Sequence, residues 1–243
     1  MLPQTDLDKI KEKAKLFLMF DLTPVENYPF IVKHPFTDSG FTLDKSTDKL
    51  VNLPQDDDAL ARWRSQIKEE IDSADNVHRI SFMLTNSYRS AFLKFTMEYM
   101  DAKDFSEYLA DYWISTESPN SDPNFSKQQL VKMFSEADKN HLMTAEKNRP
   151  LWMLPETLTV YRGVTSFNAK NIKALSWKLD QDKAEGFAQR FDEDGTVYEA
   201  EIDKKHVLAL FNGRNEAKVV VNPAYLQNIT VSESMANGFT IQM

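Results

Sequence analysis

The spacing of the apolar residues changes near residue 155, and this change constrains the fold more than any other feature of the sequence. Before it, apolar side chains recur every three or four residues, as in helices. After it, the chain consists of short β-branched and aromatic runs separated by turns, with Pro150 and Pro155 at the transition. The sequence therefore predicts an α+β protein with a helical domain of unknown role over residues 1–154 and a β-rich domain over residues 155–243.

Helical spacing in the first part predicts helices over residues 7–20, 56–73, 76–100, 104–112 and 126–137. Two of the helix starts have clear signals. The acidic run Asp56–Asp58 suits the positive end of a helix dipole, and Ser126 is a good N-cap. Residues 21–54 contain four prolines, so we expect irregular structure wrapped around a core there.

The second part is expected to form strands over residues 157–164, 195–202, 206–211 and 217–223. One helix is expected among them, over residues 181–191, with Ala184, Phe187 and Ala188 on one face.

The charge balance limits the classes of partner. A net charge of −8 argues against a general nucleic-acid binder, which needs surplus Lys and Arg to displace counterions from phosphates. The chain has no cysteine, its first fifteen residues are charged, and its most apolar early run, Leu16–Phe20, is too short to span a bilayer. We therefore expect a cytoplasmic protein that does not associate with membranes.

No metal site is expected from the sequence. The histidines are scattered without metal-ligand spacing, and the acidic run at residues 56–58 lacks the alternating pattern of a calcium loop. The four histidines are His34, His78, His141 and His206.

A few residues of the second part could carry chemistry. Arg162 follows an apolar run and precedes Gly163, so its guanidinium could meet a phosphate where the glycine leaves room. Ser176 opens the next segment, and Phe187 could offer a ring face. Taken one at a time, a surface ion pair, a turn cap and a core aromatic explain these residues as well.

The order of these pieces resembles the Arg-Ser-Glu class of ADP-ribosyltransferases. The matching stretches are "VYRGV" with Arg162, "LSWKLDQDKAEGFAQRF" with Ser176, and "GRNEAKVVVNP" with Glu216. The wider run over residues 113–223 also resembles a family of bacteriophage and prophage proteins that carry this module at the C-terminus.

The resemblance implies a split β-sandwich that holds NAD as a substrate in a cleft between two small sheets. Arg162, beside Gly163, would contact the phosphates, and Ser176 would act in catalysis near the nicotinamide ribose. Trp177 or Phe187 would pack against the nicotinamide ring. The implied reaction cleaves the nicotinamide–ribose bond through an oxocarbenium-like state and transfers ADP-ribose to a protein target. For a phage protein, the implied compartment is the cytoplasm of the bacterial host.

The sequence departs from the family pattern at the catalytic carboxylate. The family has a Glu-x-Glu pair before an apolar strand, whereas this chain has Glu216 followed two residues later by Lys218. An ammonium in place of the second carboxylate reverses the sign of its interaction with the ribosyl cation. Glu216 could itself take the catalytic role, or Glu199 and Glu201 could supply another acid, although that pair also fits the solvated face of a strand.

Three functional hypotheses follow. The chain is an NAD-dependent mono-ADP-ribosyltransferase, weakened or inactivated by Lys218. Alternatively, it is a non-catalytic module of that fold that binds NAD or a protein. In the third hypothesis it is a phage structural or accessory protein whose helical half makes the functional contacts.

Overall fold

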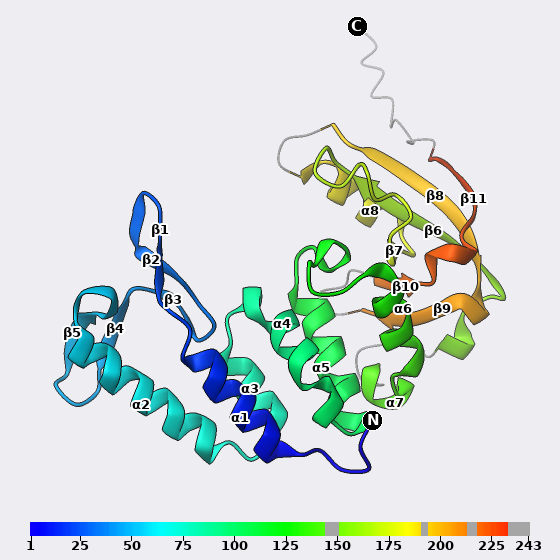
Figure 1. Ribbon diagram of the computed structural model, residues 1–243. Coiled ribbons are helices and arrows are strands. Elements are labelled where there is room, and N and C mark those ends of the chain that lie inside the picture. The colour runs from blue at the N-terminus through cyan, green and yellow to red at the C-terminus, as the bar shows by residue number, and fades with distance from the viewer. Residues whose placement is uncertain (144–150, 191–193, 213–217, 233–243) are drawn as a thin grey trace, which may run out of the picture. The chain divides into compact units, whose positions relative to one another are not determined.

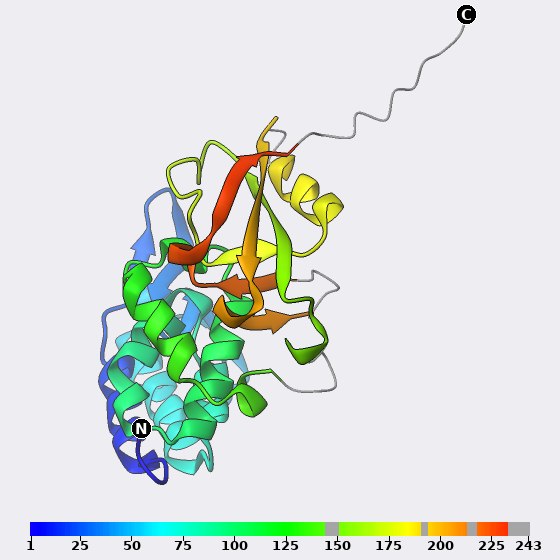
Figure 2. The same cartoon turned by 90° about the vertical axis from the view of Figure 1, so that its right-hand side faces the viewer.

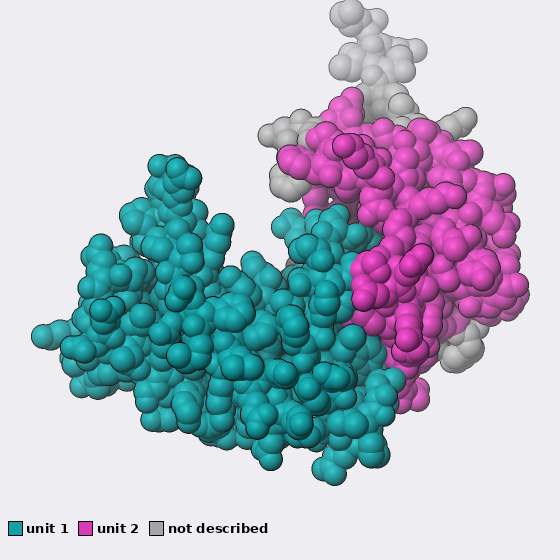
Figure 3. Space-filling view, in the orientation of Figure 1, with its two compact units in different colours: residues 1–125 teal, residues 126–243 magenta. Residues whose placement is uncertain are grey.

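The structure is a computed structural model that describes residues 1–143, 151–190, 194–212 and 218–232. It divides into two compact units, residues 1–125 and residues 126–243 (Figure 3). Both units contain helices and antiparallel strands, which confirms the α+β class. The division falls earlier than the predicted boundary at 154/155, because helix α6 (Lys127–Glu136) packs against strand β9 (Val207–Phe211) of the second unit.

The first unit contains the helices α1 (Leu7–Leu18), α2 (Asp57–Ser73), α3 (Val77–Met83), α4 (Asn86–Thr96) and α5 (Ala102–Ser115), with 3-10 turns at Leu53–Gln55, Met97–Tyr99 and Pro119–Ser121. Aspartates cap several of these helices. The side chain of Asp56 accepts a hydrogen bond from the backbone of Ala59, and that of Asp101 accepts one from Asp104. The predicted acidic start of α2 is thus confirmed.

The prediction of one long helix over residues 76–100 is wrong. The chain is extended at Leu84 and Thr85, which separates α3 from α4. The backbone N–H of Thr85 donates to the carbonyl of Pro35 at 2.8 Å. A hydrogen bond to a distant segment therefore replaces one within a helix. Residues 76–100 contain no glycine or proline that would predict the break.

The prediction of irregular structure over residues 21–54 is also wrong. This segment forms β1 (Thr23–Val25), β2 (Tyr28–His34), β3 (Thr37–Ser39), β4 (Phe41–Asp44) and β5 (Lys49–Asn52), arranged as the sheets β1-β2-β3 and β4-β5 (Figure 1). The turns before β2 and β5 contain Asn27, with φ 65°, and Asp48, with φ 53°. Asn and Asp tolerate this left-handed conformation better than most residues. Asn27 and Asp48 therefore indicate hairpin turns within this proline-containing segment.

The second unit contains the helices α6, α7 (Lys139–Leu142) and α8 (Gln181–Ala188), and the strands β6 (Thr157–Val164), β7 (Ser176–Lys178), β8 (Thr196–Asp203), β9, β10 (Lys218–Val221) and β11 (Gln227–Val231). Its 3-10 turns lie at Leu151–Met153, Lys204–His206 and Pro223–Tyr225. The four predicted strands are confirmed as β6, β8, β9 and β10, and β7 and β11 join them. Ser126 caps α6 through a capping box with Gln129, as its sequence position predicts.

The strands of this unit follow the order β11-β8-β6-β7-β10-β9, and the sheet is nearly divided at its middle. β6 pairs with β8 along its whole length, but β6 and β7 are joined by the single pair Tyr161 and Lys178. Figure 2 shows β11, β8 and β6 running across the direction of β7, β10 and β9. We call the two groups the large-strand half, β11-β8-β6, and the short-strand half, β7-β10-β9.

The two halves enclose one hydrophobic core. The strands β6, β8 and β10 contribute alternate residues, as expected where one face of a sheet is buried, whereas all five residues of β9 are buried. The buried members are Leu154, Leu158, Val160, Trp177, Ala200, Ile202, Val207, Leu210, Val219, Val221 and Leu226. The β-rich unit is therefore a small sandwich made from one sheet that opens between β6 and β7.

Helix α8 packs on β6, and Gly163 permits this contact. A Cβ atom at position 163 would lie 2.1 Å from the carbonyl oxygen of Ala184 and 2.6 Å from the backbone nitrogen of Ala188. Both of these atoms belong to the backbone of α8, so a side chain could be accommodated only by moving the helix. Gly186, on the same helix, has no atom within 4 Å of a corresponding Cβ.

This difference predicts opposite effects for two glycine-to-alanine substitutions. Gly163→Ala should destabilise the protein by about 1–3 kcal/mol through overpacking. Gly186→Ala should stabilise it by about 0.5–1 kcal/mol, because alanine is the better helix former. Urea unfolding followed by circular dichroism measures both, and a neutral Gly163→Ala would show that α8 does not pack closely on β6.

In the first unit, His78 links α3 to α5. Its Nε2 lies 2.9 Å from Glu107 Oε2, and its Nδ1 lies 3.1 Å from Asp111 Oδ2. The hydrogen bond to Asp111, opposed by partial burial and assisted by Glu107, raises the pKa of His78 to about 9. The imidazolium is thus held between two carboxylates at neutral pH.

The raised pKa predicts how His78 affects stability. Its contribution should be fully present below the unfolded-state pKa, near 6.5, and should disappear as the pH rises through about 9. The difference in unfolding free energy between wild type and His78→Gln should therefore fall by on the order of 1–3 kcal/mol over this window. Glu107→Gln, which leaves only Asp111, should move the window to lower pH. Urea titrations at a series of pH values test this, and a pH-independent difference would contradict it.

Candidate functional site

Three of the residues singled out from the sequence lie on neighbouring strands at the point where the sheet of the second unit opens. Arg162 lies on β6, Ser176 on β7 and Lys218 on β10, and these three strands are consecutive in the sheet. Val220 of β10 pairs with Ser176 across the β7–β10 ladder. Glu216 lies in residues 213–217, outside the described residues, so its predicted catalytic position stays a prediction.

Arg162 is buried and only partly satisfied. Its side chain is 9% exposed, and its Nη1 donates to the carbonyl oxygen of Ser176 at 2.7 Å. Among the residues that the structure describes, its buried Nε has no hydrogen-bond partner. Burial lowers the pKa of the guanidinium to about 10, so Arg162 remains charged at neutral pH.

The segment Lys173–Ser176, which leads into β7, is held by donors from several elements. Each of its four successive carbonyls accepts a hydrogen bond. In chain order, the donors are Lys127 Nζ, Trp177 Nε1, Val221 N and Arg162 Nη1. The backbone of this segment is therefore held in place by hydrogen bonds next to the Arg162 guanidinium.

The two aromatic candidates have different environments. Trp177 is 1% exposed, belongs to the hydrophobic core, and donates its indole N–H to Ala174 O at 2.9 Å. Phe187 lies half-buried on α8. Of the two rings, Phe187 is therefore the more exposed. The close packing of α8 on β6 explains why residue 163 is a glycine. The predicted role of Gly163 beside the phosphates of a ligand stays a prediction.

Two cations lie over the Phe187 ring. Lys178 Nζ is 4.2 Å from the ring centroid, and Arg190 Cζ is 3.6 Å from it. Both distances fall well within the range of cation–π attraction. Lys178 is 6% exposed, so one of these charges is buried at the end of β7.

Lys218 is the cross-strand partner of Lys178. Residues directly opposite in an antiparallel ladder lie on the same face, with Cβ atoms about 4.5–5.5 Å apart. Like charges in this arrangement repel. The strands β7 and β10 thus carry two ammonium-bearing side chains on one face, and one of them, Lys218, is at the position where the family resemblance implies a carboxylate.

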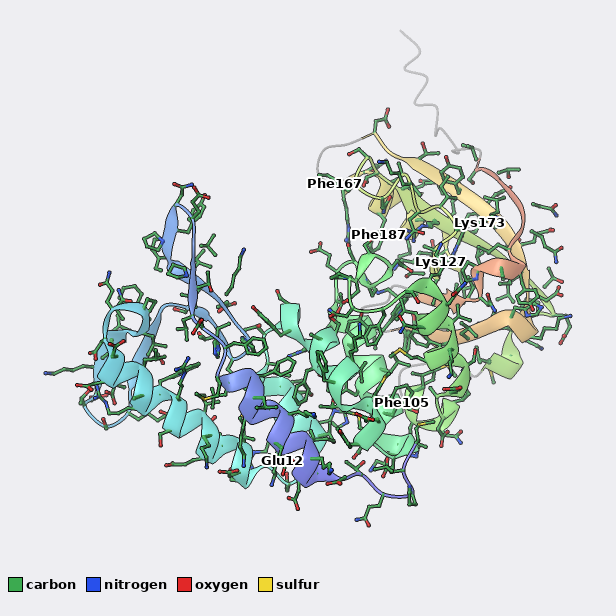
Figure 4. All side chains as sticks on the ribbon, viewed as in Figure 1. Glu12, Phe105, Lys127, Phe167, Lys173 and Phe187 are labelled. Carbon is green, nitrogen blue, oxygen red and sulfur yellow. The ribbon has the colours of Figure 1, made fainter. Side chains whose placement is uncertain are left out.

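Further positive charge lies beside Arg162. Figure 4 labels Lys127, at the start of α6, and Lys173, whose carbonyl accepts the hydrogen bond from Lys127 Nζ. Burial lowers the pKa of Lys127, and the charges of Arg162 and Lys173 lower it further. A groove of about 360 Å³ adjoins these two lysines. Its other lining residues are Gln128, Val131, Asn222, Pro223 and Ala224.

The alternative acids Glu199 and Glu201 lie elsewhere on the sheet. Glu201 Oε2 accepts a hydrogen bond from Asn228 at 2.6 Å, and Glu199 Oε1 accepts one from Thr230 at 3.5 Å. Both partners belong to the edge strand β11, and β8 is separated from β10 by β6 and β7. These contacts favour the interpretation of the pair as the outer face of an amphipathic strand.

Sequence reasoning missed three cationic residues of this region. Lys178 follows Ser176 by two positions and so shares its face of the strand, which alternation could have indicated. Arg190 follows Phe187 by three positions, a helical spacing that also places side chains together. Lys127 had no local signal, because its contact with Lys173 is made between distant parts of the chain.

Comparisons with known proteins add no relative: no family model, curated protein or solved structure matches this chain. Over the described ranges, no group of three His, Asp or Glu side chains is arranged to hold a metal ion. None of the described helices is both long and apolar enough to cross a bilayer.

Proposed function

We propose that the second unit is an ADP-ribosyltransferase-like domain that binds NAD or a related ADP-ribosyl nucleotide and turns it over slowly or not at all. The observation that carries this proposal is Arg162, a buried guanidinium with an unpartnered Nε within the described part of the chain. Desolvating a charged group is costly unless hydrogen bonds and an opposite charge compensate for it.

A phosphate group fits this requirement. The guanidinium presents N–H donors in a planar fork that matches phosphate oxygens, and Arg162 uses one nitrogen to reach Ser176 O. Lys127 and Lys173 add positive charge nearby, since the charges of Arg162 and Lys173 both act on Lys127. A pyrophosphate would therefore find one fork donor and two ammonium groups close together.

The order of elements supports the family assignment within this proposal. A strand with Arg162, a strand that starts at Ser176, and a strand that starts at Lys218 lie side by side where the sheet opens. In the proposed complex, Arg162 holds the phosphates, Phe187 contacts the nicotinamide end, and Ser176 orients the ribose. The acceptor, in a form that transfers ADP-ribose, would be a side chain of another protein.

The charge at Lys218 argues against rapid chemistry. Cleavage of the nicotinamide–ribose bond builds positive charge on the ribose, and an adjacent carboxylate would stabilise it. A like unit charge about 4 Å away costs roughly 1 kcal/mol in water and ~4 kcal/mol at an intermediate dielectric. Lys218, with Lys178 opposite, therefore opposes the transition state.

Removal of the Arg162 fork should weaken nucleotide binding. A charge-assisted contact contributes about 1.5–3 kcal/mol, so Arg162→Ala should raise the Kd for NAD roughly ten- to a hundredfold. Arg162→Lys keeps the charge without the fork, so its Kd for NAD should lie between those of Arg162→Ala and wild type. Lys205→Ala removes an exposed cation of the same unit and serves as the control. Calorimetry measures Kd, circular dichroism confirms folding, and equal affinity in folded Arg162→Ala would remove Arg162 from the site.

Restoring a carboxylate at position 218 should restore chemistry. Lys218→Glu should raise nicotinamide release from NAD about tenfold or more over wild type, because it places a negative charge beside the ribosyl cation. Lys218→Gln removes the ammonium without adding a carboxylate, so it should raise nicotinamide release less than Lys218→Glu does. The opposite pattern, substantial wild-type activity that Glu216→Gln abolishes and Lys218→Ala leaves unchanged, would identify Glu216 as the working acid.

A further inference from the structure

We propose that Lys127 is a covalent attachment site, whose amine condenses with an anionic aldehyde or ketone held in the groove that α6 and the 3-10 turn Pro223–Tyr225 line. This inference goes beyond the proposed function and does not depend on it, because it concerns a reactive amine and a separate class of ligand. The ligand class follows from the lining of the groove and from the charges beside it.

The groove belongs wholly to the second unit and has room for one small molecule. Val131, Pro223 and Ala224 contribute apolar surface to it, and Lys127 and Lys173 contribute ammonium groups. Its volume of about 360 Å³ falls within the range of small-molecule sites. No Asp or Glu lines it among the residues that the structure describes. A ligand with an apolar body and an anionic group, such as an aromatic carboxylate, therefore complements the groove in polarity and in charge.

The Lys127 amine is held in position by a backbone group. Its Nζ donates a hydrogen bond to the carbonyl oxygen of Lys173, and over the described ranges no ion pair joins it to a carboxylate (Figure 4). A carboxylate partner would favour the proton on the amine. The bond to the carbonyl uses one N–H and leaves the lone pair of the neutral amine available.

The surroundings of Lys127 also favour the neutral, nucleophilic form of its amine. Burial lowers the pKa of Lys127, and the charges of Arg162 and Lys173 lower it further. Lysines become nucleophiles when they are desolvated or lie next to another cationic group, because a larger fraction of the amine then carries a free lone pair. Both conditions are met here, beside a groove that a ligand can enter.

Lys132 provides the contrast on the same helix. Its side chain is 72% exposed, and its Nζ lies 3.8 Å from Glu136 Oε1. The Glu136 carboxylate repels an approaching anion, whereas the charges of Arg162 and Lys173 attract one. Lys127 and Lys132 therefore form an internal comparison within one chain.

The proposed reaction is a condensation that needs no oxidant or reductant. The lone pair of Lys127 Nζ attacks the carbonyl carbon of the ligand, an N–C bond forms, and a proton passes from the nitrogen to the former carbonyl oxygen. The product loses its hydroxyl and the remaining N–H proton as water, which leaves an imine. Lys173, at the same groove, would hold the anionic group of the ligand.

Two aldehydes that differ by one charge test this inference: 4-carboxybenzaldehyde, which is anionic at neutral pH, and its uncharged methyl ester. The whole chain is incubated with each at the same pH and ionic strength, imines are reduced with cyanoborohydride, and peptide mass spectrometry measures modification of each lysine. With the anionic aldehyde, Lys127 should react at least about fivefold faster than Lys132, the factor that one opposite charge about 4 Å away gives in water. With the methyl ester, the ratio of the Lys127 rate to the Lys132 rate should be smaller and still above one.

Three variants locate the effect. Lys173→Met keeps a long side chain and removes the ammonium, so it should lower the Lys127-to-Lys132 ratio for the anionic aldehyde. Val131→Asp places a carboxylate in the groove and should lower this ratio as well. Lys205→Met removes an exposed lysine that does not line the groove and should leave the ratio unchanged. Circular dichroism establishes that each variant is folded.

Equal rates at Lys127 and Lys132 with the anionic aldehyde would overturn the attachment site. A ratio that is the same for both aldehydes would overturn the ligand class, because the groove would then not select an anion. A ratio for the anionic aldehyde that is unchanged in folded Lys173→Met and in folded Val131→Asp would show that the ligand does not lie in this groove.

Discussion

The hydrogen bond from Arg162 to the carbonyl of Ser176 joins β6 to β7 where their backbones pair at one position only. The large-strand and short-strand halves diverge from this point and close around a shared core. The guanidinium is buried by that closure, and its Nε is left without a partner in the described part of the chain. The proposed function assigns the phosphates of a nucleotide to this guanidinium.

Positive charge is concentrated in this region although the chain as a whole carries a net charge of −8. Lys127 interacts electrostatically with Arg162 and Lys173. Lys178 and Arg190 lie over the Phe187 ring, and Lys218 pairs with Lys178 across the β7–β10 ladder. In the proposed function, Arg162, Lys127 and Lys173 would contact the phosphates of the nucleotide.

Several elements were predictable because their determinants are local. The strand over residues 157–164 alternates along its length, and the starts of α2 and α6 carry Asp56 and Ser126 as caps. The break at Thr85 was not predictable, since its backbone N–H bonds to Pro35 in a distant segment. The hairpins before residue 54 were missed for a different reason: four prolines outweighed the turn signals at Asn27 and Asp48.

The sequence by itself determined the candidate residues Arg162 and Ser176, the departure at Lys218, and the strand-forming character of the segments that carry them, because these depend on residue type and on spacing within a strand. Only the tertiary structure decided that Trp177 belongs to the core, that Gly163 is required by α8, and that Lys178 and Arg190 share the Phe187 ring. Apart from the contact of Arg190 with Phe187, which is three residues away, each of these facts is a contact between elements that are separated in the chain. Local propensity cannot specify such contacts, since the packing of one sheet half on the other sets which side chains meet.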